Sequence, residues 1–103
     1  TYVINNNLYG SINCFNACVK NNAKLIFLST SRVYPIETIE KALFIEEQTK
    51  FLFTDNQNIT GISSKGISEE LSLEGARSFY GTTKLSSELF IHEYAAFYGL
   101  CSR

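Results

Sequence analysis

The fold is decided by residues 25–35, which read LIFLSTSRVYP. The first four residues form a continuous apolar run, which is typical of a strand that is covered on both faces of a parallel sheet. This run leads directly into hydroxyl residues, and open α/β sheets bind their ligands at the carboxyl ends of such strands. The stretch therefore predicts an α/β fold with a candidate binding site just after residue 28.

A second stretch, residues 79–98, has the apolar periodicity and length of a helix. Near its start, Tyr80 and Lys84 stand four residues apart and so share one helical face. A fixed ammonium favours the phenolate form of a tyrosine and lowers its pKa from about 10, and acid–base catalysis works best when the pKa lies near the working pH. On its own, such a pair is more often an ordinary feature of a helix surface.

Four motifs occur in one order along the chain: Asn7–Ser11, Ser29–Tyr34, Glu69–Glu70 and Tyr80–Lys84. In this order they resemble the extended short-chain dehydrogenase/reductases, especially the NAD-dependent sugar-nucleotide epimerases and dehydratases. The resemblance covers nearly the whole chain and implies a Rossmann-type, doubly wound parallel sheet. The long insert between the second and fourth motifs is most similar to the branch that contains the CDP-paratose 2-epimerases.

The resemblance implies three catalytic residues. Tyr80 is expected to be the acid/base that exchanges a proton with a sugar hydroxyl. Lys84 is expected to lower the pKa of Tyr80 and to bind the nicotinamide ribose. Thr30 is expected to hold the reacting hydroxyl in line with the phenol.

The resemblance also implies binding residues. Asn7, Ser29, Tyr80 and Lys84 are expected to contact the cofactor, and the substrate is expected to meet Thr30, Ser31 and Arg32. Two of these positions have plainer alternatives: an asparagine near a helix start is a good N-cap, and an arginine at a loop is commonly solvated rather than bound to a phosphate.

The implied reaction is epimerisation of a nucleotide sugar through a transient keto-sugar, with NAD as the cofactor and NADP as the alternative. Dehydration is disfavoured because Ser31 and Arg32 stand where the dehydratases of the family carry Asp-Glu. Two other interpretations remain open. One is a one-way NAD(P)-dependent reductase or dehydrogenase, and the other is an inactive truncated product that keeps only a helical interface.

No Gly-x-Gly-x-x-Gly motif occurs in the chain, although such a loop normally holds the pyrophosphate of NAD at a helix start. We therefore expect residues 1–103 to be the central, catalytic part of a Rossmann-type domain. This fragment would lack the N-terminal glycine-rich βαβ unit and the C-terminal substrate domain. The 103-residue chain by itself is expected to be inactive.

Periodicity and turn signals predict the remaining elements. A helix is expected at about residues 8–21, an irregular insert at about 36–78 with a short helix after Pro35 and a short strand at 51–53, and a last helix from Ser78 to Gly99. The last helix is apolar on two sides, and relatives in the resembling family use these two long helices to form a homodimer. A homodimer through residues 8–21 and 79–98 is therefore expected.

Composition bears on the expected partners, location and metal content of the protein. The chain has a formal net charge of −1 and 45% hydrophobic residues, which gives no basic field for nucleic acid. No apolar run approaches the roughly 20 residues of a membrane span, and no signal peptide is visible, so a cytoplasmic location is expected. With a single histidine and three cysteines that we expect to be reduced, no metal site is predicted.

Overall fold

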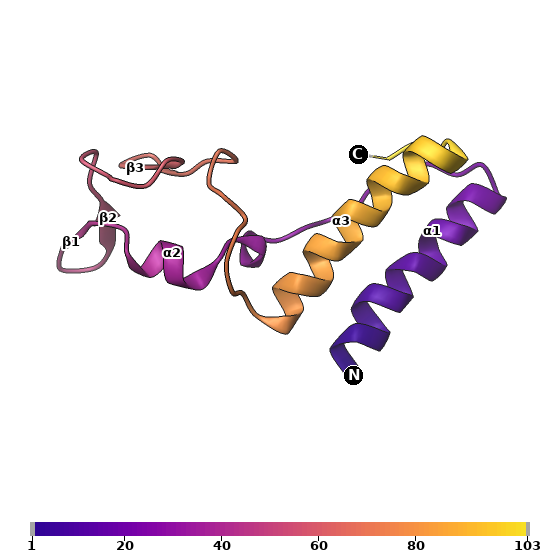
Figure 1. Cartoon of the computed structure of the whole chain (residues 1–103), viewed down its shortest axis with the longest axis horizontal. Coiled ribbons are helices and arrows are strands. Elements are labelled where there is room, and N and C mark those ends of the chain that lie inside the picture. The colour runs from indigo at the N-terminus through magenta and orange to yellow at the C-terminus, as the bar shows by residue number, and fades with distance from the viewer. Residues whose placement is uncertain (1, 103) are drawn as a thin grey trace. The chain divides into compact units, whose positions relative to one another are not determined.

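The computed structural model describes residues 2–102, which form two compact units (Figure 1). The first unit joins the chain up to Val33 with the chain from Ser78 onward, and the second unit is Tyr34–Arg77. In chain order the elements are η1 (Ile4–Tyr9), α1 (Gly10–Lys20), η2 (Ser31–Val33), α2 (Ile36–Glu40), β1 (Phe44–Glu46), β2 (Phe51–Phe53), β3 (Ile62–Ser63), β4 (Gly66–Ile67) and α3 (Phe79–Tyr98).

The amino-terminal helix is longer than the sequence predicts. Residues 2–3 are already helical, and the chain continues without a break through the π-helix η1 into α1. The prediction that Asn7 caps this helix is therefore wrong, because helical turns already precede it and its own backbone is part of them. The amide of Gly10 donates to the carbonyl of Asn5, five residues back, as in a π-helical turn.

The prediction of the last helix is confirmed at both ends. Ser78 caps α3 because its Oγ accepts a hydrogen bond from the amide of Gly81 at 3.0 Å. Gly99 ends the helix with a φ of 68°, a left-handed conformation that glycine adopts without steric cost. Helices α1 and α3 lie side by side in the first unit (Figure 1).

The strand predicted at residues 25–28 is only partly formed. Leu25 makes a single parallel bridge with Ser102, and its amide donates to the carbonyl of Cys101 at 2.9 Å. Leu25 and Phe27 pack against the helices, whereas Ile26 and Leu28 are 78% and 80% exposed. The prediction of cover on both faces is therefore wrong for residues 2–102, since α1 and α3 cover only one side of this extended segment.

The predicted doubly wound parallel sheet is likewise not formed by residues 2–102. The two sheets there are small and antiparallel, and both lie in the second unit. A parallel sheet needs neighbouring strands that run in the same direction along the whole segment. In the described part of the chain only Ser102 provides such a neighbour, for one residue.

Phe15 is the centre of the first unit's core and is 1% exposed. It lies with Ile91 and Leu100, so it joins α1 to α3 and to the chain that follows α3. Its ring makes edge-on contacts with the rings of Phe27 and Tyr94, at centroid distances of 6.1 and 5.5 Å. One phenylalanine thus ties both helices to the extended segment.

The second unit contains more regular structure than an irregular insert. The predicted short helix and the predicted strand at 51–53 are confirmed as α2 and β2. Strands β1 and β2 form an antiparallel hairpin, and the core consists of Ala42, Ile62 and Leu71.

A loop of the second unit holds a hydrogen-bonded carboxylate. Ser64 donates hydrogen bonds to Asp55 from both its hydroxyl and its amide, and these bonds hold the pKa of the Asp55 carboxyl below its ordinary value of 3.8.

Three further properties of the described residues bear on function. None of the helices within residues 2–102 combines the length and hydropathy that a membrane span requires. The same residues contain no cluster of His, Cys, Asp or Glu that could hold a metal ion. All three cysteines are free thiols.

Replacing Phe15 by alanine should remove the contact that joins α1, α3 and the extended segment. The full protein here means the native chain that contains residues 1–103. We expect its free energy of unfolding to fall by about 3–5 kcal/mol, the usual cost of emptying a buried phenylalanine site. Urea unfolding measures this change. The control Phe79→Ala, at a position that is 78% exposed on α3, should change stability by no more than about 0.5 kcal/mol. Equal losses in the two variants would contradict the assigned core.

Candidate active site

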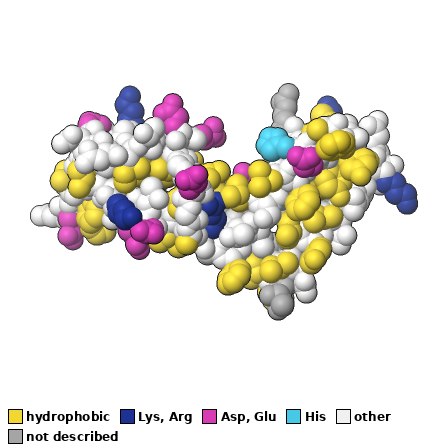
Figure 2. All heavy atoms as spheres, viewed as in Figure 1, with side chains coloured by type: hydrophobic (Ala, Val, Ile, Leu, Met, Phe, Trp, Pro, Cys, Tyr) yellow, Lys and Arg dark blue, Asp and Glu magenta, His cyan; other side chains and the backbone are white. Residues whose placement is uncertain are grey.

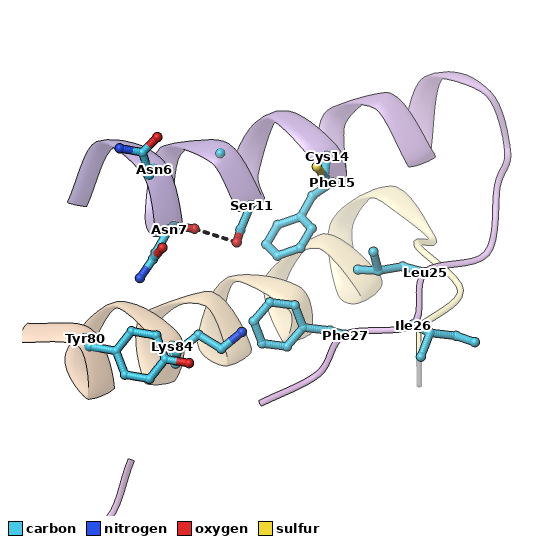
Figure 3. Close-up of a pocket in the computed structure, with 11 residues that line it drawn as sticks. Asn6, Asn7, Ser11, Cys14, Phe15, Leu25, Ile26, Phe27, Tyr80 and Lys84 are labelled. Carbon is cyan, nitrogen blue, oxygen red and sulfur yellow. Dashed lines mark hydrogen bonds between the residues drawn. The ribbon is translucent and has the colours of Figure 1, made fainter. Parts of the chain in front are cut away.

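A cavity of about 540 Å³ opens in the first unit between the amino-terminal helix, α3 and the extended segment (Figure 3). Its lining mixes apolar side chains with groups that can donate or accept hydrogen bonds. The lining residues are Asn6, Asn7, Gly10, Ser11, Cys14, Phe15, Leu25, Ile26, Phe27, Tyr80 and Lys84. A cavity of this size and character is typical of a small-molecule site.

Tyr80 and Lys84 both line this cavity from the first turns of α3. The spacing of four residues therefore brings them to one face, as the sequence predicts. Tyr80 is 44% exposed, so its phenol is accessible to a ligand. The arrangement presents a phenol and an amine from one face of α3 to the same cavity.

Lys84 is held in place by the extended segment. Its Nζ donates a hydrogen bond to the carbonyl of Leu28 at 2.5 Å and lies 4.1 Å from the centre of the Phe27 ring. An ammonium over an aromatic face is attracted by the ring's quadrupole. Since an ammonium has three donors, this lysine retains donor capacity beyond the bond to Leu28.

Asn7 faces α3 across the cavity. Figure 3 shows Asn7, Ser11 and Phe15 pointing from the amino-terminal helix toward α3. The Asn7 amide donates to Thr83 Oγ1 at 3.4 Å, and that buried hydroxyl donates to the carbonyl of Tyr80 at 2.8 Å. Asn7 therefore cross-links the two helices next to the phenol-bearing residue.

The other predicted site residues lie in the segment that follows Phe27 and are not among the residues that line the cavity within the described chain. Thr30 is half-buried, and its Oγ1 accepts a hydrogen bond from the Arg32 amide at 3.2 Å. Ser29, Ser31 and Arg32 are exposed. The structure thus brings together Asn7, Tyr80 and Lys84, with the hydroxyl residues in the adjoining segment.

Gly81 allows this adjoining segment to approach α3. A Cβ at this position would lie 2.0 Å from the carbonyl oxygen of Arg32, closer than any real contact. The turn η2 therefore packs directly on the first turn of α3, beside Tyr80. Sequence reasoning missed this role, because the approach depends on how η2 packs against α3.

Several cavity residues were also missed from the sequence. Ser11 and Cys14 follow Asn7 at steps of four and three, so a search for further polar residues on that helical face would have found them. Phe27 carried no such signal, because its place under Lys84 depends on tertiary packing.

Comparison with known proteins bears on this geometry. The sequence model of the NAD dependent epimerase/dehydratase family matches residues 1–102. A search among curated proteins found no match to the chain. The family match includes both helices and every residue that lines the cavity.

Replacing Gly81 by alanine should force η2 away from α3, because the added methyl group overlaps a backbone oxygen. We expect a loss of about 1–3 kcal/mol in the free energy of unfolding, typical of overpacking, measured by urea unfolding of the full protein. The matched control is Gly10→Ala in the other helix, where the nearest atom to a Cβ would be 4.0 Å away. That control should be neutral or stabilising by up to about 1 kcal/mol. A harmless Gly81→Ala would refute the close approach.

Proposed function

The chain belongs to the NAD dependent epimerase/dehydratase family, whose members are typically enzymes that use NAD or NADP, and we propose that it supplies the acid/base centre of a nucleotide-sugar epimerase. The observation that carries the proposal is the cavity that Tyr80 and Lys84 line together, with Asn7 opposite. The family implies a Rossmann-like α/β fold.

We extend the fold proposal to a parallel sheet that includes residues 25–28. The bridge between Leu25 and Ser102 is parallel, and α1 and α3 cover one side of the extended segment. Exposed Ile26 and Leu28 point to the other side, where the second layer of helices of a doubly wound sheet would lie. These features support a parallel sheet, of which the described residues form one bridge.

In the proposed reaction, Tyr80 takes a proton from a sugar hydroxyl and later returns one to the same oxygen. The Thr30 hydroxyl holds the sugar oxygen by donating a hydrogen bond to it. It can do so because its Oγ1 only accepts from the Arg32 amide, which leaves its own hydrogen to be donated. Lys84 keeps a positive charge at the cavity wall, where it stabilises negative charge that develops on oxygen as the proton moves. Epimerisation results when the keto-sugar presents its other face before the carbonyl is reduced.

When bound, NAD supplies the acceptor and donor of the hydride. The residues that would hold its nicotinamide and ribose are Asn7, Tyr80 and Lys84, which line the cavity, and Ser29 in the adjoining segment. The mixed lining of the cavity suits a ring that is part apolar and part hydrogen-bonding. The six glycines of residues 1–103 do not have the spacing of a pyrophosphate loop. This chain therefore fits the nicotinamide end of NAD, and the pyrophosphate cradle is not part of it.

The proposed substrate role of Arg32 and Ser31 follows from their place beside Thr30. Both are exposed in η2, so either side chain can reach a ligand that extends past Thr30. A guanidinium is well suited to the diphosphate of a nucleotide sugar.

Replacing Tyr80 by phenylalanine in the full protein should remove the proton-transfer group while it keeps the shape of the side chain. We expect turnover of nucleotide sugar to fall by about 10²–10⁴-fold, the usual contribution of a general acid or base, with NAD affinity nearly unchanged. The matched control is Tyr98→Phe, because Tyr98 is exposed at the other end of α3. This control should leave turnover unchanged.

Steady-state kinetics and titration with NAD measure these effects. Undiminished turnover in Tyr80→Phe would refute the role of Tyr80. Release of NADH in step with product by the unmodified protein would instead favour one-way redox chemistry over epimerisation.

We also propose that a second copy of the chain packs on α3. Large apolar side chains remain exposed along this helix, including Leu89, Phe90 and Phe97. Figure 2 shows hydrophobic side chains gathered over the unit that holds α1 and α3. A face of this kind is unusual on a helix that meets only water.

Introducing a charge on this face should separate the copies. We expect Leu89→Glu to convert the full protein from a dimer to a monomer, because burial of an unpaired carboxylate at an interface is costly. Light scattering during gel filtration measures the mass. Leu73→Glu, a matched change in the second unit, should leave the mass unaltered. A monomeric unmodified protein would refute the proposal.

A further inference from the structure

We propose that Glu88 is a positioning residue that acts through Ser29 to hold the Thr30 segment against α3. The inference rests on the proposed function, since it concerns the placement of Thr30 relative to Tyr80. Glu88 follows Lys84 by one helical turn and is half-buried. Its carboxylate accepts a hydrogen bond from the Ser29 hydroxyl.

Three consecutive residues of the extended segment are tied to two residues of α3. The Phe27 ring lies under the Lys84 ammonium, the Leu28 carbonyl accepts from the same group, and the Ser29 hydroxyl donates to Glu88. Because Lys84 and Glu88 are four residues apart, they present their charges along one face of the helix. The two side chains therefore clamp the segment at successive positions.

Thr30 lies between this clamp and a second contact. On its far side, the carbonyl of Arg32 meets the backbone of α3 at Gly81. The hydroxyl residue expected to hold the substrate is thus anchored from both directions to the helix that carries Tyr80. Removal of the Glu88 anchor would release the segment at Ser29, immediately before Thr30.

The chemistry of the pair explains why a carboxylate suits this position. An ionised carboxylate only accepts hydrogen bonds, so it fixes the direction of the Ser29 hydroxyl. A hydrogen bond to an ionised group is also roughly twice as strong as a neutral one. Ser29 can then meet a bound ligand only as an acceptor, since its one hydrogen is already donated.

Glu93 provides an internal comparison. It lies on the same helix, is exposed, and makes no hydrogen bond or ion pair among the described residues. A carboxylate that served only to keep α3 soluble would resemble Glu93. Glu88 differs from it by a specific contact that spans 59 residues of sequence.

The test compares Glu88→Ala, Glu88→Gln, Ser29→Ala, the double variant Ser29→Ala/Glu88→Ala and the control Glu93→Ala in the full protein. Hydrogen exchange is followed at the hydrogen-bonded amides of Leu25, Arg32 and Val33. Glu88→Ala and Ser29→Ala should each speed exchange at Arg32 and Val33 by about tenfold or more. Glu88→Gln should retain protection, because its amide oxygen still accepts, and Glu93→Ala should have no effect.

Kinetics give a second and independent readout. Glu88→Ala should lower kcat by about 10–100-fold with a much smaller change in KM. The reason is that a misplaced Thr30 holds the bound substrate less often in the geometry required for reaction. The glutamine variant should restore most of kcat. The double variant should be no worse than Ser29→Ala alone, since Ser29→Ala already breaks the hydrogen bond to Glu88.

The outcomes separate this inference from the proposed function. Unchanged exchange and kcat in Glu88→Ala, or losses that add fully in the double variant, would overturn the role of Glu88 and leave the proposed reaction intact. An unmodified protein without turnover would overturn the proposed reaction, and with it the catalytic purpose of the positioning. The exchange measurement would then still decide whether the clamp exists.

Discussion

The contact between the extended segment and α3 is the constraint on which the candidate site depends. Lys84 reaches the Leu28 carbonyl at 2.5 Å, and the absence of a side chain at Gly81 lets the Arg32 carbonyl rest on the helix. These two contacts lie on either side of Thr30. This segment has no full sheet to hold it, and contacts with α3 itself fix its position relative to Tyr80.

Phe15 lines the cavity and also packs together the helices that enclose it. Burial of one aromatic side chain contributes about 1.5–3 kcal/mol, and here the same ring joins α1, α3 and Phe27. The polar residues Asn7 and Thr83 then bond across the helix pair near Tyr80. Apolar packing thus holds the helices together at one end of the cavity, and a hydrogen-bonded link orients them at the other.

The two long helices could be predicted because their signals are local. The caps at Ser78 and Gly99 and the common face of Tyr80 and Lys84 depend only on residues within a few turns. The segment at 25–28 could not be predicted in the same way. A continuous apolar run predicts that both faces of a strand are buried, but the elements that bury them lie far away in the sequence. Within residues 2–102 only one face of this segment is covered, by α1 and α3.

The sequence by itself determined the helix that carries Tyr80 and Lys84, the helical face that these two residues share and the order of the motifs along the chain. Only the tertiary structure decided that Lys84 rests on Phe27 and Leu28, that Gly81 admits the Arg32 carbonyl, and that Glu88 holds Ser29. The physical reason is the separation in sequence between the residues that interact. Helical periodicity and capping act between neighbours in the chain, whereas these contacts join residues about 50–60 positions apart, which only folding brings together.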